Sequence, residues 1–160
     1  MEEQGFINSH DYKLIKSRAE RYCDVQDRSI FETVMKLKSW GCEPEWINTI
    51  IKELTNSGHI DEQRFANNFA RGKFRIKSWG KLKITAALYQ LRIASAIINN
   101  ALNQIDEGDY RITLTEIIEK KLKITRGEAN IRINKTAAYA LGKGFESTLV
   151  FEVLKTINLK

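Results

Sequence analysis

Apolar residues recur in this chain at a period of about 52 residues, and this repeat constrains the possible folds more than any other feature. Cys42, Ile93 and Phe145 lie 51 and 52 residues apart, and apolar residues follow each of them at offsets of four, five, eight, nine and twelve. These offsets trace one face of an α-helix. Three copies of the same stripe predict three helical units of similar structure.

A second set of positions marks where helices should begin. Ser9, Asp61 and Thr113 are 52 residues apart, and each can cap a helix because its side-chain oxygen accepts a backbone N–H that has no partner within the helix. Glu116, three residues after Thr113, completes a capping box. In two copies the apolar residue before the cap is expected to contact the residue five positions later. These pairs are Ile60 with Phe65 and Ile112 with Ile117.

A middle helix fits between these two sets in each unit, and Ser29 with Glu32 gives its first copy a capping box. The sequence therefore predicts an all-α fold, an elongated array of three tandem three-helix repeats over residues 1–58, 59–108 and 109–160. The segment 104–111 is predicted to be a flexible joint. The expected helices are 9–24, 29–40 and 44–56; 61–77, 80–91 and 95–105; and 113–123, 129–142 and 147–157. The glycines expected to end helices are Gly41, Gly58, Gly108 and Gly144.

The net charge of +6 and the pI near 9.3 favour anionic partners such as nucleic acid, anionic lipid or an acidic protein surface. The two cysteines, Cys23 and Cys42, form neither a disulfide framework nor a zinc-binding spacing. The first residues lack the features of an export signal, and no apolar run approaches the ~18 residues of a membrane span. We therefore expect a cytoplasmic protein that does not insert into a membrane.

No arrangement of residues predicts catalysis or metal binding. His10 and His59 lie in different copies of the repeat and have no ligand spacing. The sequence has no nucleophile elbow, P-loop or dinucleotide fingerprint, and Gly142-Lys143-Gly144 is interpreted as the end of a helix. We expect no catalytic residue, no metal and no cofactor, and hence a protein that is not an enzyme.

The segment 70–83 is the most informative local feature, because it combines six basic residues with Phe74 and Trp79 and has no acidic residue. This composition is typical of nucleic-acid surfaces, where cations contact phosphates and rings stack on bases; it also suits an acidic protein surface. The structural alternative is that the charges offset a helix dipole and the rings belong to the core. Smaller basic clusters at 13–21 and 120–126 are interpreted as solvated helix faces. The candidate binding residues are Arg71, Lys73, Arg75, Lys77, Lys81 and Lys83.

The residues from Leu54 to Ala66 resemble the central signature of the RecX family, an L-x-x-x-G-x-[LI]-D-[DE]-x-R-F-A pattern. The segment 79–84 is similar to the glycine-led second helix of that family, and the segments 28–41 and 140–145 resemble its flanking motifs. The likeness extends from about residue 25 to the C-terminus. Within it, we expect Asp61, Arg64 and Phe65 to hold the repeat together by capping, pairing and packing, and Gly80 to begin a helix.

The sequence departs from the family pattern at two positions. Arg92 precedes Ile93 where the family usually has glycine, and Lys81 follows Gly80 where proline or another small helix-starting residue is common. We expect both changes to affect local capping more than the fold.

The resemblance implies three three-helix repeats that bind the RecA recombinase and its nucleoprotein filament, lie in the groove of the filament, and inhibit strand exchange and ATP hydrolysis. Some members of the family also contact DNA, single- or double-stranded, and the family has no metal or cofactor. We therefore expect a monomeric modulator of RecA filaments. The alternative is a helical DNA-binding protein that acts without a recombinase.

Overall fold

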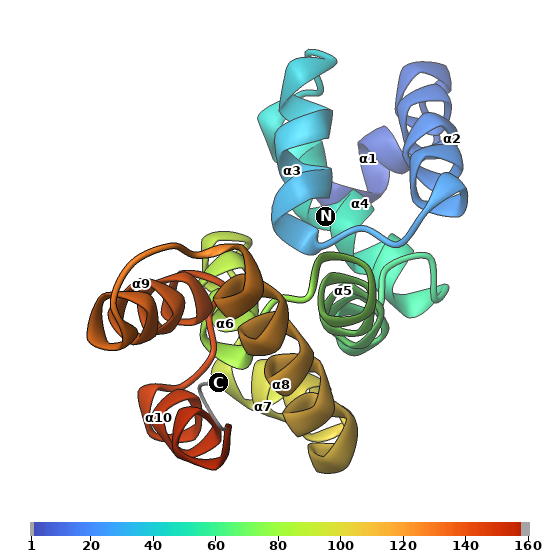
Figure 1. Ribbon diagram of the computed structural model, residues 1–160. Coiled ribbons are helices and arrows are strands. Elements are labelled where there is room, and N and C mark those ends of the chain that lie inside the picture. The colour runs from blue at the N-terminus through green and yellow to red at the C-terminus, as the bar shows by residue number, and fades with distance from the viewer. Residues whose placement is uncertain (1, 158–160) are drawn as a thin grey trace.

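The computed structural model describes residues 2–157, and the regular secondary structure in that range is entirely helical (Figure 1). Figure 1 shows the first unit at one end of the molecule, with α5 connecting it to the group formed by α6–α10. The first unit comprises α1 (Glu2–Ile7), α2 (His10–Val25), α3 (Ile30–Ser39) and α4 (Pro44–Asn56). The second comprises α5 (Glu62–Lys77), α6 (Lys81–Gln90) and α7 (Ser95–Asn103), and the third α8 (Glu107–Ile124), α9 (Ala129–Gly142) and α10 (Ser147–Thr156).

This architecture confirms the predicted all-α array of three tandem three-helix repeats, to which α1 is an addition. Eight of the nine predicted helices begin within one residue of the predicted position, and the start signals of α2, α3, α4 and α5 operate as expected. The hydroxyl of Ser9 accepts from the backbone N–H of Tyr12 at 3.1 Å. Ser29 and Glu32 form the full capping box at the start of α3, and Pro44 occupies the first turn of α4.

The helix α8 is the exception, because it begins at Glu107 and not at the predicted Thr113. Asp106 is the N-cap and accepts a hydrogen bond from the backbone N–H of Asp109 at 2.9 Å. Two acidic residues in the first turn also suit the positive end of a helix dipole. The connection predicted at 104–111 is therefore shorter than expected: residues 104–106 join α7 to α8, whereas residues 107–111 belong to α8. Gly108, which was expected to end a helix, lies in the first turn of α8.

The same correction removes the basis for a staple between Ile112 and Ile117, since Ile112 lies inside α8 and is 58% exposed. It also bears on where the third unit starts. We propose a boundary between residues 105 and 106 in place of the expected one after residue 108, so that α8 with its cap belongs to one unit.

In the part of the chain that the structure describes, the buried apolar side chains form two cores, not three. One core is formed by the first unit together with Ile60, which follows α4, and it contains both free cysteines, Cys23 and Cys42. The other is shared by the second and third units, from Phe65 in α5 to Leu154 in α10. Ile60 belongs to the first core and Phe65 to the second. The apolar residues before and after Asp61, the N-cap of α5, therefore pack in different cores.

The repeating stripe accounts for much of this burial. Cys42, Ile93 and Phe145 are all buried, as are the residues five and eight positions after each of them. The positions four residues on are partly buried and pack against the same cores. The stripe therefore confirms the helix faces that the repeat predicted.

The turn before α6 and the turn before α10 meet backbone to backbone. The N–H of Gly80 donates to the carbonyl of Lys143 at 2.8 Å, and the N–H of Leu82 donates to the carbonyl of Gly144 at 2.9 Å. A Cβ atom on Gly80 would overlap the backbone of Gly144 and Phe145. Gly144 also has a φ of +98°. Side chains are thus excluded on both sides of this crossing, which joins the second unit to the third.

Tyr110 of α8 completes this junction. Its hydroxyl donates to Oε1 of Glu146 at 2.6 Å and accepts from the backbone N–H of Lys81 at 3.0 Å. Its ring lies 5.8 Å from that of Phe74 and 5.0 Å from that of Phe145, centroid to centroid. Burial, followed by the hydrogen bond to the Glu146 carboxylate, raises the pKa of Tyr110 well above its usual value. One residue therefore links helices of both units.

Across residues 2–157, none of the helices combines the length and the apolar character that crossing a bilayer requires.

Candidate functional site

The predicted binding stretch Arg71–Lys83 covers the end of α5, the turn that follows and the start of α6. α5 ends at Lys77, and Ser78 then adopts a left-handed conformation with a φ of 54°. The backbone N–H of Trp79 donates to the carbonyl of Lys73 at 3.1 Å, which closes the turn. The chain folds back over the end of α5, so basic residues before and after the turn can meet.

Two of the predicted lysines meet at the indole ring of Trp79. The Nζ atom of Lys73 lies 4.8 Å from the ring centroid, and that of Lys83 lies 4.7 Å from it. Lys73 is also 5.4 Å from the ring of Phe69. Trp79 packs against the second core, so the core fixes the ring and cation–π attraction holds both ammonium groups beside it. Two positive charges are thereby fixed at one place on the surface.

The arginines of the stretch lie elsewhere on α5. Arg71 and Arg75 line a small hollow with Asp106 and Asp109, at the turn between α7 and α8. Acidic groups therefore share this hollow with the guanidinium groups and reduce its positive potential. The side chain of Lys77 is exposed at the end of α5.

The side chain and the backbone of Lys81 both make contacts within the protein. Its Nζ atom pairs with Oε1 of Glu107 at 2.7 Å and lies 4.8 Å from the centroid of the Tyr110 ring. Its backbone N–H is the one that donates to the Tyr110 hydroxyl. The structure therefore separates the six predicted residues into a pair at Trp79, a pair of arginines near acidic groups, an exposed Lys77 and a paired Lys81.

Sequence reasoning missed a further set of cations beside this stretch. The Nζ atom of Lys143 donates to the backbone carbonyl of Lys77 at 2.7 Å. Lys143 also lines a hollow with Ser78 and with Lys120 and Lys121 of α8. These lysines were interpreted as a solvated face and a helix end. The signal available in the sequence was their charge alone, because the contact joins residues 66 positions apart.

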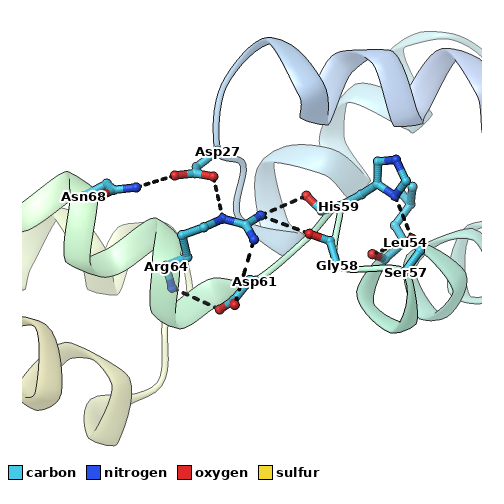
Figure 2. A network of polar contacts seen from close by, with 8 residues as sticks. All are labelled: Asp27, Leu54, Ser57, Gly58, His59, Asp61, Arg64 and Asn68. Atoms are coloured by element: carbon cyan, nitrogen blue, oxygen red, sulfur yellow. Dashed lines mark hydrogen bonds and ion pairs between the residues drawn. The ribbon is translucent and has the colours of Figure 1, made fainter.

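The motif residues Asp61 and Arg64 lie at the junction of the first and second units (Figure 2), and Phe65 follows them in α5. Asp61 caps α5 by accepting from the backbone N–H of Arg64 at 3.0 Å. The Nε atom of Arg64 donates to Oδ1 of Asp27 at 2.8 Å, and Asn68 donates to Oδ2 of the same carboxylate at 2.6 Å. The guanidinium also reaches the carbonyls of residues 58 and 59, at 3.2 and 3.4 Å. Phe65 is buried in the second core.

Electrostatics at this junction follow from these contacts. The hydrogen bonds from Asn68 and Arg64 hold the pKa of the Asp27 carboxyl below its usual value. Glu62 accepts from the backbone N–H of Ile30 at 3.4 Å, but burial outweighs this bond and raises the pKa of Glu62. The guanidinium of Arg92 adds a contact with the ring of Phe31, 5.1 Å from its centroid. The first junction is therefore mainly polar.

The histidines of the described chain lie apart from one another. His59 shares a hydrogen bond of 2.6 Å with the Ser57 hydroxyl (Figure 2) and lies 3.7 Å from Asp24. His10 begins α2 and is exposed. Between residues 2 and 157, no three side chains of His, Cys, Asp or Glu are grouped so that they could hold a metal ion.

Comparisons with known proteins agree with this arrangement. A family model described as "RecX, second three-helix domain" matches residues 61–102. The chain is 30% identical to the regulatory protein RecX of Pelodictyon phaeoclathratiforme over 138 residues, which cover 84% of this chain and 83% of that protein. It is 26% identical to the regulatory protein RecX of Prosthecochloris aestuarii over 148 residues, 92% of this chain and 96% of that one. A crystal structure of RecX from Lactobacillus salivarius shares the fold, with a TM-score of 0.84 at 21% identity over 94% of this chain and 98% of that chain.

Proposed function

Because the chain belongs to the RecX family, we propose that it binds the RecA recombinase filament on DNA and modulates it, mainly by inhibiting recombinase and ATPase activity during recombination and DNA repair. It acts in the cytoplasm as a regulatory protein, by binding and not by catalysing a reaction.

The observation that carries this proposal is the fixed pair of positive charges at Trp79. Lys73 and Lys83 are held at the indole ring by geometry that exists before any partner binds. The exposed Lys77 extends this pair along the end of α5. Preorganised side chains lose less conformational entropy on binding, so this site suits contact with an acidic recombinase surface or with phosphates.

The tandem array supplies the means of modulation. Units arranged in series can contact more than one protomer of a filament, which is itself a repeating structure. A protein that binds the inactive arrangement of the protomers more tightly than the active one shifts the filament toward the inactive state. The size of the shift equals the difference between the two affinities.

The test is titration of the protein into the DNA-stimulated ATPase of the cognate RecA. The double variant Lys73→Glu/Lys77→Glu should need about tenfold more protein for the same inhibition, the equivalent of roughly 1.4 kcal/mol. Lys81 is left unchanged because its substitution would also break the ion pair with Glu107.

The control is Lys38→Glu/Lys52→Glu, which changes the net charge equally at two exposed positions of the first unit. It should inhibit as the unmodified protein does. The absence of any inhibition by the unmodified protein, at every concentration and with DNA in excess, would contradict the proposal.

A second candidate function is direct DNA binding without a recombinase, which the basic residues beside Lys143 favour. In that case inhibition would arise only from competition for DNA and would disappear when DNA is added in excess. Binding to DNA alone would also weaken steeply with salt, because each neutralised phosphate releases counterions.

A further inference from the structure

The outer face of α6 is apolar and exposed, although the inner face of this helix is already buried. Ile84 and Leu88 are fully buried on the inner face, where α6 packs against α5 and α7. On the opposite side Leu82 is 57% exposed and Tyr89 is 54% exposed, and the exposed Ala86 lies between them. Residues four and three positions apart share one side of a helix, so these three form one stripe, the α6 stripe. A helix that is apolar on both sides is typical of one that is covered on both sides.

The α6 stripe carries no charge along its length, and the residues around it are basic. Residues 84–91 contain no charged side chain. Lys83 adjoins the stripe in the first turn of α6, and the exposed Arg92 follows the other end of the helix. Glu107 of α8 is paired with Lys81. From residue 63 to residue 105 the sequence has eight lysines and arginines and no aspartate or glutamate. The rim of the stripe therefore has a positive potential that attracts carboxylates.

Side-chain contacts hold the far end of the α6 stripe in place. The Tyr89 hydroxyl shares a hydrogen bond of 2.7 Å with the hydroxyl of Ser95, at the start of α7, and this bond fixes the ring. The guanidinium of Arg92 lies 5.1 Å from the centroid of the Phe31 ring. A partner that binds here meets side chains that are already ordered, so less conformational entropy is lost on binding.

The chemistry of the α6 stripe favours a protein segment over other anionic partners. A nucleic acid pairs its phosphates with cations, and the aliphatic side chain of Leu82 offers it no hydrogen bond. A helix at a lipid surface immerses a broad apolar face, whereas the α6 stripe offers two large side chains. An amphipathic protein segment presents apolar side chains on one face with polar groups beside them, and so matches both the stripe and its rim. Tyrosine and arginine are also enriched among the residues that dominate protein–protein binding.

We propose that the α6 stripe docks an amphipathic segment of the recombinase protomer, one that presents apolar side chains flanked by carboxylates. The apolar side chains cover the stripe, and the carboxylates pair with Lys83 and Arg92. This inference rests on the proposed function, because it takes the recombinase as the partner. Since the stripe begins beside Lys83, the contact continues the basic pair at Trp79 along α6 and adds an apolar part that salt does not screen.

The experiment measures binding of the full chain to recombinase filaments on immobilised DNA, with the same DNA free of recombinase as the blank. The double variant Leu82→Ser/Tyr89→Ser should bind at least about tenfold more weakly, because it removes two apolar side chains from the contact. The salt dependence of binding should stay unchanged, since no charge is altered. Ala86→Glu should also weaken binding about tenfold or more, because it places a carboxylate in the middle of an apolar contact.

Leu14→Ser/Met35→Ser is the matched control, because it removes two apolar side chains of similar exposure, 55% and 51%, from the first unit. It should bind as the unmodified chain does. Circular dichroism of each variant verifies that the helices are intact. If both variants of the stripe bind the filament as tightly as the control does, this inference is overturned, and the filament proposal stands as long as the unmodified chain still inhibits the ATPase.

A cross-linking measurement identifies the occupant of the α6 stripe. With p-benzoylphenylalanine in place of Ala86, irradiation of the complex should attach the chain to a recombinase peptide that contains both apolar and acidic residues. Attachment to DNA, to a second copy of the chain or to anionic vesicles, in place of the recombinase, would overturn the inference. A chain that neither binds the filament nor inhibits the ATPase contradicts the filament proposal, and the inference with it.

Discussion

The two junctions between the three units have opposite chemistry, although the units themselves repeat. The first and second units meet through Arg64, Asp27 and Asn68, and the side chains of the first two are 42% and 27% exposed. The second and third units share one apolar core and a backbone crossing at Gly80 and Gly144, both of which are buried. Exposed ion pairs contribute at most about 1 kcal/mol, whereas burial of one large apolar side chain contributes about 2 kcal/mol.

This difference teaches that a sequence repeat does not imply equal coupling between repeats. We expect α5–α10 to unfold as one cooperative body and the first unit to separate from it at lower cost. Charge follows the same division, since residues 1–58 carry eight basic and ten acidic residues, and residues 59–160 carry 18 basic and ten acidic ones. The surfaces proposed to bind anions thus belong to the fused pair of units.

The strongest test of the comparison is Gly80→Ala. The added methyl group would overlap the backbone of Gly144 and Phe145, which cannot move aside as a flexible side chain can. We expect a loss of about 3 kcal/mol in the free energy of unfolding. Hydrogen exchange should show the loss throughout α5–α10 and little change in α2–α4.

Gly72→Ala is the matched control, because a Cβ at that position would meet no atom within 4 Å beyond its chain neighbours and the adjacent backbone of α5 itself. It should stabilise the protein by up to about 1 kcal/mol, the difference in helix propensity between the two residues. Equal destabilisation of α2–α4 by Gly80→Ala would show that all three units form one cooperative body.

A substitution at the polar junction between the first and second units should cost less stability than Gly80→Ala. Arg64→Ala should reduce the free energy of unfolding by about 1 kcal/mol or less, but it should widen the distribution of distances between spin labels on α3 and α6. A double-mutant cycle with Asp27→Ala isolates the pair. A coupling energy well above 1 kcal/mol would remove the distinction between the junctions.

Acid should weaken the same junction. The pKa of Asp27 is below its ordinary value of 3.8 in the folded protein, so its ionised form adds stability above that value. This contribution is lost as the pH falls through the folded-state pKa. We expect the label distances to broaden below about pH 4, and the Asp27→Asn variant to lack this transition.

The smallest effect is expected at Arg92, which has a φ of 59° at the repeat position that glycine occupies in the other two units. Gly41 and Gly144 have φ values of 74° and 98°. Arg92→Gly removes strain of about 1 kcal/mol, but greater freedom of the unfolded chain and loss of the Phe31 contact offset most of it. The free energy of unfolding, measured by thermal unfolding, should therefore change by about 0.5 kcal/mol or less. Arg92→Ala keeps a side chain in the left-handed conformation and loses the Phe31 contact, so it should destabilise the protein by about 0.5–1 kcal/mol.

The helix faces could be predicted because the spacing of apolar residues indicates which positions are buried, such as Ile93 and Phe145. The start of α8 could not. Thr113 with Glu116 is a valid local signal, but Asp106 is the cap, and this longer helix brings the Tyr110 hydroxyl to Lys81 and Glu146. Only the packing of distant segments decides between two such caps.

The same limit applies to the binding surface. The stretch Arg71–Lys83 stands out because its basic residues are close together in sequence with no acidic residue among them, yet Lys81 is paired with Glu107 from a different helix. Lys143 follows a helix end, and nothing near it in the sequence indicates that it reaches Lys77. The sequence shows where basic residues are dense. It does not show which of them are paired with acidic residues, or which come together from different helices.

The location of the two thiols gives this molecule a built-in reporter. Cys23 and Cys42 are the only cysteines of the chain, and both are buried in the core of the first unit. A thiol-reactive dye added to the native protein is therefore blocked until that unit opens, and burial, which raises the pKa of both thiols, slows the chemistry further. The rate of thiol labelling would therefore report how often the first unit opens, without any signal from the other two units, which contain no cysteine.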